Sequence, residues 1–359
     1  MNPAPLPVVA AVLPGGEGFG PGGVGAIGLI VHRLAGAESG FRTVVLAPAG
    51  GVLFADRDVV AVRAWPFPGL FARARYPWAV LRALRRLRPA LVEVHNRPAL
   101  ALFLAGRVSM PVVLVLHNDP WGMRRAHSAA ERAVLLRRVA GVAVVSVFLR
   151  DRLLSGVTEA APVVVVPNGI DLAGLPPALP AEGREPMVLF VGRTIREKGV
   201  DAFLRACDLA LPELPGWRGV MIGSRDHTPE GDVLGPQARV DVLGWRPHAE
   251  VMAWMGRAAI VLMPSRWEEP FGLAALEAMA MGAALMASAR GGLPEVTGDA
   301  AVPVDPEDPA KIAQALVALA RDPARRAALA ERGRARAAGF GVTASAVRLD
   351  TLRRLVLRG

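Results

Sequence analysis

The most informative stretch of this chain is Pro264-Ser-Arg-Trp-Glu-Glu-Pro-Phe-Gly-Leu-Ala-Ala-Leu-Glu-Ala-Met-Ala-Met-Gly282. The apolar run 259–263 before it predicts a strand, and residues 273–281 are good helix formers. Glu269 therefore lies in the connecting loop and Glu277 about one turn into the helix. The free N–H groups and positive dipole at a helix start favour an anion such as phosphate. The pattern predicts two carboxylates that flank a phosphate and accept hydrogen bonds from sugar hydroxyls, although an ordinary acidic loop before a helix has the same spacing.

Strand-like apolar runs alternate with helical patterns along the whole chain. Such runs of Val, Ile and Leu indicate parallel strands that are buried on both faces. Two series of them, in a chain of 359 residues, predict an α/β protein of two doubly wound domains. The predicted strands are residues 6–13, 43–46, 91–94, 112–116, 142–146 and 163–166, followed by 188–191, 219–222, 240–243, 259–263 and 283–287.

One segment interrupts this alternation and is predicted to link the domains. Residues 171–186 contain four prolines and two glycines, which is typical of a linker. We place the domains at 1–172 and 187–340, with 173–186 between them. Residues 309–357 are rich in Ala and Arg and predict two or three terminal helices.

The net charge of +10 is concentrated in the first half of the chain, where residues 1–180 contain 19 Arg against 10 Asp and Glu. Such a surplus favours an acidic partner: an anionic membrane surface, a phosphorylated acceptor or nucleic acid. Arg82, Arg85, Arg86 and Arg88 are predicted to share one helix. Aromatic residues make up only 5% of the chain, so nucleic acid is the least favoured partner. An Arg-rich solvated surface is the plain alternative.

The sequence favours a cytoplasmic protein, with peripheral contact to the inner face of the membrane as a further option. The sole cysteine, Cys207, excludes a disulfide within the chain and fits a reducing compartment. Residues 1–13 have no basic start and contain three prolines, so no signal peptide is expected. The longest apolar stretch, 273–289, is interrupted by Glu277 and two glycines, so no transmembrane helix is expected.

Two cations follow the predicted strand 188–191. Gly192 ends that strand, Arg193 and Lys198 come next, and Gly199 leads into a helix. Basic side chains at the carboxyl end of a strand are placed to hold phosphate in the usual ligand crevice. Lys198 is one of two lysines among 42 basic residues, which suggests that a compact point charge is required there. A surface turn with scattered charge is the alternative interpretation.

The first half contains two further candidate regions. Gly18, Gly20 and Gly23 match G-x-G-x-x-G, but the second strand lacks the carboxylate that a dinucleotide site requires. The glycines before the first helix, including Gly23 with Val24, are better candidates for contacts to phosphate or a sugar.

Polar side chains follow two predicted strands of the first half. His117, Asn118 and Asp119 come after residues 112–116, and His95 comes after 91–94. These positions face the ligand crevice of an α/β sheet. We expect His117 to bind a substrate hydroxyl, and Asn118, Asp119 and His95 to face an acceptor, although histidines that cap loops have the same pattern.

No metal site is predicted. Asp56-Arg-Asp58 matches D-x-D but lacks a supporting ligand cluster and is interpreted as a turn. The six histidines have no metal-ligand spacing.

Together these blocks resemble the retaining glycosyltransferases of family 4, which have the GT-B fold, and more loosely the members that build bacterial polysaccharides. The resemblance rests on Gly22-Gly-Val-Gly25, His117, Val166-Pro-Asn-Gly-Ile-Asp171, Gly192-Arg193 with Lys198-Gly199, and Glu269 with Phe271-Gly272 and Glu277. It implies two Rossmann-like domains facing across a cleft, an N-terminal acceptor domain and a C-terminal nucleotide-sugar domain. It also implies that a C-terminal helix, residues 341–359, returns to the first domain.

The resemblance also implies roles for individual residues. Arg193 and Lys198 would neutralise the donor diphosphate, Glu269 would bind the donor sugar and Glu277 the ribose. The backbone N–H groups of Gly272 and Leu273 would hold the distal phosphate. The remaining donor-binding candidates are Gly23, Val24, Gly192, Gly223, Trp245, Arg246 and Phe271, and the catalytic set is Arg193, Lys198, Glu269 and His117. Two departures from the family pattern are the additional carboxylate of Glu268 and the presence of Asn118 where many relatives have an acid.

The implied activity is metal-independent, retaining transfer of a hexose-type sugar from a nucleotide sugar, with UDP favoured and GDP next, and with no cofactor. The acceptor would be a glycan, a lipid-linked molecule or a small molecule. The alternatives are a GT-B-like sugar-nucleotide epimerase and a non-catalytic, membrane-associated binder of sugar nucleotides.

Overall fold

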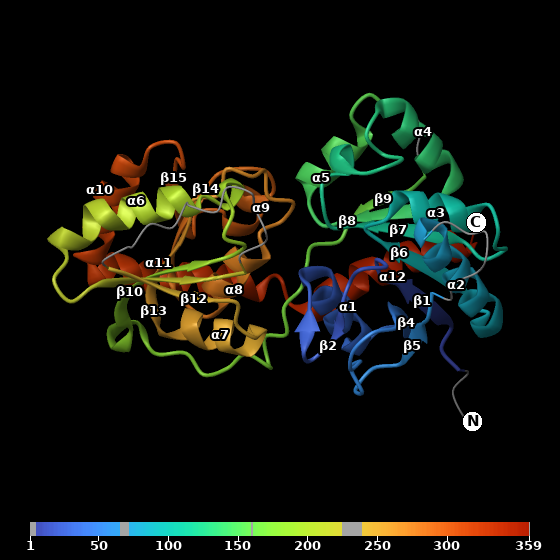
Figure 1. The fold of residues 1–359 in the computed structure, drawn as a ribbon, viewed down its shortest axis with the longest axis horizontal. Coiled ribbons are helices and arrows are strands. Elements are labelled where there is room, and N and C mark those ends of the chain that lie inside the picture. The colour runs from blue at the N-terminus through green and yellow to red at the C-terminus, as the bar shows by residue number, and fades with distance from the viewer. Residues whose placement is uncertain (1–4, 65–71, 159–160, 225–238, 359) are drawn as a thin grey trace. The chain divides into compact units, whose positions relative to one another are not determined.

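The computed structural model describes residues 5–64, 72–158, 161–224 and 239–358, with the side chains of the second helix described from Arg75 onward. Contacts divide the chain into two compact units (Figure 1). The first unit contains residues 1–170 and 341–359, and the second contains residues 171–340.

The first unit is built on a sheet of seven parallel strands in the order β5-β4-β1-β6-β7-β8-β9. Its strands are β1 (Val8–Val12), β4 (Arg42–Pro48), β5 (Val59–Val62), β6 (Leu91–His95), β7 (Val112–Leu116), β8 (Gly141–Val144) and β9 (Val163–Val165), and its helices are α1 (Ala26–Gly36), α2 (Ala72–Leu87), α3 (Pro98–Ala105), the 3-10 turn η1 (Pro120–Gly122), α4 (Ala129–Arg138), α5 (Val147–Leu154) and α12 (Val342–Arg358). A two-stranded hairpin, β2 (Phe19–Gly20) and β3 (Gly23–Val24), precedes α1. Every residue of β6, β7 and β8 is buried, as the continuous apolar runs predict for central strands.

The C-terminal helix α12 packs in the first unit, as the family resemblance implied. Arg353 of this helix donates two hydrogen bonds to Glu93 of β6, at 2.7 and 2.9 Å, and both side chains are at most 3% exposed. Asp350 accepts hydrogen bonds from the Ser39 hydroxyl and the Gly40 N–H group, at 2.8 and 2.7 Å. Two charged groups of α12 are therefore fixed to a strand and a loop that lie more than 250 residues earlier in the chain.

The second unit has a sheet of six parallel strands in the order β12-β11-β10-β13-β14-β15. Its strands are β10 (Glu185–Val191), β11 (Arg218–Ile222), β12 (Val240–Gly244), β13 (Ala258–Met263), β14 (Ala284–Ser288) and β15 (Ala301–Val304), its helices are α6 (Val200–Ala210), α7 (His248–Arg257), α8 (Leu273–Ala280), α9 (Leu293–Thr297), α10 (Pro309–Ala320) and α11 (Pro323–Ala338), and its 3-10 turns are η2 (Ala181–Gly183), η3 (Arg196–Lys198) and η4 (Leu211–Glu213). Residues 171–184, within the predicted linker, belong to this unit and have no regular structure except η2.

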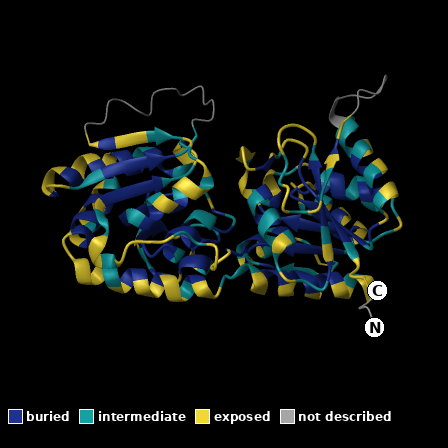
Figure 2. Ribbon diagram, turned by 90° about the horizontal axis from the view of Figure 1, so that it is seen from below, coloured by how far each residue is buried: buried dark blue, intermediate teal, exposed yellow. Residues whose placement is uncertain are grey.

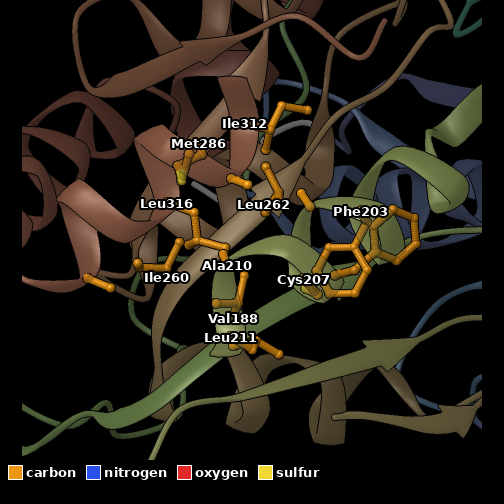
Figure 3. Close-up of a cluster of buried hydrophobic side chains, with 14 of the residues drawn as sticks. Val188, Phe203, Cys207, Ala210, Leu211, Ile260, Leu262, Met286, Ile312 and Leu316 are labelled. Atoms are coloured by element: carbon orange, nitrogen blue, oxygen red, sulfur yellow. The ribbon is translucent and has the colours of Figure 1, made fainter. Parts of the chain in front are cut away.

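Each sheet is buried beneath its helices, and the solvent-facing helix surfaces are exposed (Figure 2). In the second unit, α6 and α10 pack on the sheet through a core that includes Phe203, Cys207 and Leu316 (Figure 3). Cys207 is buried, and desolvation raises the pKa of its thiol. It therefore behaves as a small core side chain.

In both sheets the strand order reverses once, and this point locates the ligand crevice. The chain moves outward from β1 to β4 and β5 and then returns to β6 on the other side of β1; β10 and β13 have the same relationship. Ligands of such sheets bind beyond the carboxyl ends of the strands at the reversal. The loop 264–272 follows β13, and residues 192–199 follow β10, so the two blocks with the predicted charged residues meet at the reversal of the second sheet.

The structure adds elements that the sequence did not predict. Strands β5 and β15 and the hairpin β2–β3 were missed. β5 and β15 are edge strands of their sheets. Three of the four residues of β5 and all four residues of β15 are at least partly exposed. Both are short runs of four residues, and β15 contains Pro303, which an edge strand tolerates. Residues 309–358 form three helices, at the upper end of the predicted number.

Candidate active site

A short ion pair of the second unit joins the two blocks singled out in the sequence. The Lys198 Nζ atom lies 2.6 Å from Glu269 Oε1. Lys198 ends the turn η3, and Gly199 then takes the left-handed conformation, with φ of 74°. A Cβ atom on Gly199 would lie 1.8 Å from the Pro264 carbonyl oxygen. Only glycine therefore allows the loop after β10 to touch the loop after β13 closely enough for this ion pair.

Trp267 joins the two predicted cations. The Arg193 guanidinium carbon lies 5.3 Å from the centroid of the Trp267 ring, and the Lys198 Nζ lies 5.5 Å from it. Cations at this distance are attracted to the electron-rich face of indole. Trp267 thus keeps both positive charges close to the loop that follows β13. Sequence reasoning did not assign a role to Trp267, because a lone Trp in a loop gives no positional signal.

Glu269 is buried, whereas its neighbour Glu268 is exposed. The Ser265 hydroxyl donates a hydrogen bond of 2.9 Å to the Glu269 Oε1 atom that also contacts Lys198. The Glu269 carbonyl accepts a hydrogen bond from Gly292 N at 2.6 Å, and this pairing fixes the backbone of the loop. Glu269 is therefore the carboxylate that the fold directs inward, and it is also the one that the family resemblance assigns to the donor sugar.

Helix α8 begins at this loop and carries the second carboxylate. Gly272 precedes the helix with φ of 99°, and a Cβ atom there would lie 2.4 Å from Leu293 Cδ2. Glu277 is buried, and its Oε1 atom lies 2.8 Å from Nε2 of His248, the first residue of α7. His248 is a site residue that the sequence did not reveal, because 29 positions separate it from Glu277.

Gly192, Gly223 and Gly244 lie at the carboxyl ends of β10, β11 and β12, where backbone hydrogen bonds join the strands. Gly192 N donates to the Ile222 carbonyl and Gly223 N to the Gly244 carbonyl, each at 3.0 Å. A Cβ atom on Gly223 would lie 1.7 Å from the Gly192 carbonyl oxygen, so glycine is required there. The backbone at this edge is consequently open for a ligand to approach closely.

The remaining donor-binding candidates have different environments. Trp245 is 56% exposed, and its carbonyl accepts a hydrogen bond of 2.9 Å from Arg246, which lies 3.6 Å from Glu250. Phe271 is 4% exposed and packs edge-on against Phe340, with ring centroids 5.8 Å apart. The Phe271 ring is therefore part of the core, and only the backbone of this residue remains for a ligand.

In the first unit the structure brings together two histidines that the sequence treated separately. His95 Nδ1 and His117 Nε2 are 3.0 Å apart, and the rings stack at 18°. Both rings are buried, and the outer nitrogens, His95 Nε2 and His117 Nδ1, have no partner among the described residues. Burial lowers the pKa of His95 to about 3 and holds the pKa of His117 well below its usual value. Both rings are neutral at pH 7, so one of them donates the hydrogen bond between these two nitrogens and the other accepts it.

Asn96 fixes the loop that carries this pair. Its side-chain oxygen accepts hydrogen bonds from the N–H groups of His117 and Asn118, each at 3.1 Å, and its φ of 56° is a conformation that asparagine tolerates better than most residues. Asp119 caps the turn η1 through the N–H group of Trp121 and lies 3.5 Å from Arg152. The Asp119 carboxylate thus has a structural role in addition to the acceptor role proposed from sequence.

The glycines before α1 form a hairpin, and the first turn of α1 after it already binds a carboxylate of the chain. Gly23 and Val24 form β3, and Gly28 N donates a hydrogen bond of 3.0 Å to Glu17 Oε1. A carboxylate therefore already complements the dipole at the first turn of α1. The residues around Gly23 suit a sugar hydroxyl better than a phosphate, because Glu17 would repel an anion.

The aspartates of the D-x-D motif are engaged in ion pairs. Asp56 contacts His32 and Arg57, and Asp58 contacts Arg42 at 2.8 Å. Within residues 5–64, 72–158, 161–224 and 239–358, no group of three or more His, Cys, Asp or Glu side chains is arranged to hold a metal ion. No helix in this part of the chain is both long enough and apolar enough to span a membrane.

Two Rossmann-like units define the GT-B class of glycosyltransferases, and comparison with known proteins agrees with this class. HepE from Anabaena, solved with UDP and glucose, superposes with a TM-score of 0.78 at 20% identity, over 96% of this chain and 99% of that one. The family model described as Glycosyltransferase Family 4 matches residues 29–173, and the model described as Glycosyl transferases group 1 matches residues 175–336. The chain belongs to glycosyltransferase family 4.

Two relatives illustrate the range of the family. Glycogen synthase from Mycobacterium tuberculosis is 31% identical over 369 residues, which cover 88% of this chain and 86% of that protein. D-inositol 3-phosphate glycosyltransferase 1 from Catenulispora acidiphila is 34% identical over 190 residues, or 48% of this chain and 45% of that protein. The chain therefore spans about half the length of the second relative. Membership of this enzyme family favours a transferase over the epimerase and the non-catalytic binder.

Proposed function

We propose that the protein is a retaining, metal-independent glycosyltransferase that moves a hexose-type sugar from a nucleotide sugar, UDP-sugar before GDP-sugar, to a glycan, lipid-linked or small-molecule acceptor. The observation that carries this proposal is the contact of Lys198 with Glu269 beside Arg193, at the carboxyl ends of β10 and β13. Two positive charges and a buried carboxylate meet there. A sugar diphosphate presents the matching groups, which are negative charge and hydroxyls.

The proposed reaction follows from the charge that develops on the leaving group. The bond between the anomeric carbon and the phosphate oxygen breaks, and its electron pair stays with the nucleoside diphosphate. Lys198 and Arg193 stabilise the new negative charge, together with the N–H groups of Gly272 and Leu273 at the start of α8. These groups perform the task that a metal ion has in other transferases, so the reaction requires none.

Retention of anomeric configuration is consistent with attack from the face that the phosphate leaves. The acceptor hydroxyl oxygen forms the new bond to the anomeric carbon, and its proton passes to the departing phosphate oxygen. In this mechanism Glu269 binds a sugar hydroxyl and forms no covalent bond. His117, neutral at pH 7, binds another hydroxyl of the sugar, with His95 fixing its ring through the 3.0 Å contact.

Glu277 is assigned to the ribose hydroxyls, and the base is assigned to the exposed Trp245 and the adjacent Arg246. His248 orients the Glu277 carboxylate in the ligand-free protein through the 2.8 Å contact. UDP is favoured as the nucleotide because HepE, which shares this fold, was solved with UDP and with UDP-glucose.

A thermal-shift screen with UDP, GDP, ADP and their sugars tests the donor class. A ligand at 100 times its Kd stabilises the protein by about 2.7 kcal/mol, which corresponds to a rise of roughly 5–10 °C in Tm. UDP and one UDP-sugar should raise Tm the most. A larger shift with GDP would reverse the donor preference, and no shift with any nucleotide would contradict the assignment of the second unit. The anomeric configuration of the product, measured by NMR, then tests retention.

Peripheral membrane contact through the first unit is part of the proposal. Arg82, Arg85 and Arg86 lie exposed along α2. Vesicles that contain phosphatidylglycerol should sediment the protein at low salt, and the binding should weaken above the ionic strength that screens such charges. Equal sedimentation with neutral phosphatidylcholine vesicles would contradict electrostatic binding.

A further inference from the structure

The first unit has a concave region near the carboxyl ends of two of its central strands. A pocket of about 840 Å³ is lined by Gly15 and Gly16, which follow β1, and by Arg97, which follows β6. β1 and β6 are the strands at which the order of the sheet reverses, so the pocket lies where such sheets bind ligands. Its volume is within the usual range for small-molecule sites. Arg97 is two residues after His95, which the sequence assigned to the acceptor side.

Five arginines from four separate segments line this pocket. One precedes α3, one follows α3, two lie in the loop after η1 and one ends α4: Arg97, Arg107, Arg124, Arg125 and Arg138. No Asp or Glu lines the pocket in the part of the chain that the structure describes. Convergence from segments so far apart in sequence is not a consequence of local composition, although the chain is rich in arginine.

None of these arginines has a carboxylate partner among the described residues. Arg97 donates a hydrogen bond to the Asn96 carbonyl at 3.0 Å, and Arg107 donates to the Phe103 carbonyl at 3.2 Å. Such neutral partners orient a guanidinium but leave its charge uncompensated. In the same unit, by contrast, Arg353 is paired with Glu93, and Arg152 contacts Asp119.

The pocket wall also has apolar and aromatic surface. Tyr76, Leu100, Phe103 and Val134 contribute to it, and the guanidinium carbon of Arg107 lies 4.3 Å from the centroid of the Phe103 ring. Aromatic and aliphatic groups pack against the C–H faces of a sugar or polyol. A ligand that matches both features has a carbohydrate-like body and an anionic group.

We propose that this pocket binds the phosphate ester of the acceptor. A phosphate ester carries up to two negative charges and has several oxygens, so it receives hydrogen bonds from several guanidinium forks at once, which one carboxylate does not. The pocket would thus select phosphorylated sugars or polyols, or a phospholipid headgroup, over their uncharged counterparts. That the bound molecule is the acceptor rests on the proposed function, whereas phosphate binding itself does not.

The test compares two double variants of the full chain that lose the same charge. Arg124→Gln/Arg138→Gln changes the pocket, and Arg137→Gln/Arg348→Gln changes exposed arginines of the same unit that do not line it. Isothermal titration calorimetry measures the binding of glucose 6-phosphate, inorganic phosphate and uncharged glucose, and also of UDP. Sedimentation with phosphatidylglycerol or phosphatidylcholine vesicles forms the lipid arm.

Glucose 6-phosphate should bind more tightly than glucose, and saturating UDP should not displace it. Affinity should fall on the order of 100-fold in the pocket variant, since each charged hydrogen bond contributes about 1.5–3 kcal/mol, and should be unchanged in the control variant. If the pocket variant loses binding to phosphatidylglycerol vesicles but not to glucose 6-phosphate, the phosphate that the pocket binds is that of a lipid headgroup. Equal losses in both variants, or no loss in either, would overturn the pocket assignment. If UDP fails to bind while phosphate esters bind as expected, the proposed function is wrong and the pocket stands.

Discussion

The Lys198 ammonium and the Glu269 carboxylate lie 2.6 Å apart although 71 residues separate them in the chain. Each residue follows a different strand, and the two strands, β10 and β13, are neighbours in the second sheet. Under the proposed function, the donor inserts its phosphates and sugar at this ion pair, where each charge neutralises the other.

Lys198→Ala should lower kcat by about 100- to 1000-fold, because a lost contact to the transition-state charge costs on the order of 3 kcal/mol. The circular dichroism spectrum and Tm should be close to those of the wild type. Lys311→Ala is the matched control, since Lys311 is the other lysine of the chain and is largely exposed on α10. Near-normal turnover of Lys198→Ala with its true donor would contradict the phosphate role.

Glu269→Gln should lower kcat/KM for the sugar donor much more than the affinity for free UDP. In the proposed mechanism the substitution replaces the charged acceptor of the sugar hydroxyl by a weaker, neutral amide, and it leaves the Lys198 charge without its partner. Glu268→Gln removes the same charge from the exposed neighbouring side chain and should change kcat/KM less than threefold. If the two variants lost activity equally, the loop would act through its net charge, and the assignment of Glu269 would be wrong.

Donor hydrolysis or transfer should persist in excess EDTA. In the proposed mechanism Lys198, Arg193 and the start of α8 supply the positive potential at the leaving phosphate, so removal of divalent ions should not change kcat. The measurement is turnover before and after chelation, and again after Mg²⁺ or Mn²⁺ is restored. If turnover were lost in EDTA and restored by either ion, the reaction would require a metal, and Asp56 and Asp58 would be the candidate ligands.

Arg353→Met should reduce the free energy of unfolding by about 3–5 kcal/mol, because it leaves Glu93 buried without its ionic partner. Arg348→Met, an exposed position on the same helix, should change it by less than about 0.5 kcal/mol. Urea denaturation measures both. A small loss for Arg353→Met would mean that the pair contributes little to holding α12 against the sheet.

The histidine pair should make the fold sensitive to acid. The pKa of His95 is about 3 in the folded protein and that of His117 is also depressed, whereas both are near 6.5 in the unfolded chain. Their stabilising effect is therefore complete above pH 6.5 and declines as pH falls from there toward the folded pKa values. Each histidine contributes a slope approaching about 1.4 kcal/mol per pH unit.

His95→Gln removes one of these titrations. The dependence of the unfolding free energy on pH, measured between pH 7 and 5, should become shallower by about 1.4 kcal/mol per unit at the acid end. The comparison uses the slope, so a general loss of stability in the variant does not affect it. An unchanged slope would show that His95 has the same pKa in the folded and unfolded states, which would contradict its burial as a neutral ring.

Sequence reasoning identified every central strand and two of the four edge strands, β9 and β12, and it missed the other two, β5 and β15. Central strands are buried on both faces, and continuous runs such as Val112–Leu116 make them visible. β5 and β15 are apolar too, but they are edge strands of only four residues each and are largely partly exposed. The burial of the Phe271 ring against Phe340 was equally hidden, because that contact depends on a residue 69 positions later.

The partners of the predicted site residues could not be found in the sequence either. His248 reaches Glu277 from α7, Trp267 lies under two cations, and His95 stacks on His117. Each pair comes from segments that only sheet order makes neighbours. Local patterns show which residues are polar and where strands end, but they contain no information on which ends meet.

The sequence by itself determined the two α/β domains, the family, and the candidates Arg193, Lys198, Glu269 and Glu277, because periodicity, glycine positions and short spacings are local properties of the chain. Tertiary structure alone decided which carboxylate faces Lys198, which rings hold the cations, and that five arginines of the first unit converge on one pocket. The physical reason is that charge and hydrogen bonding act over a few ångströms in space, and the folded sheets set those distances.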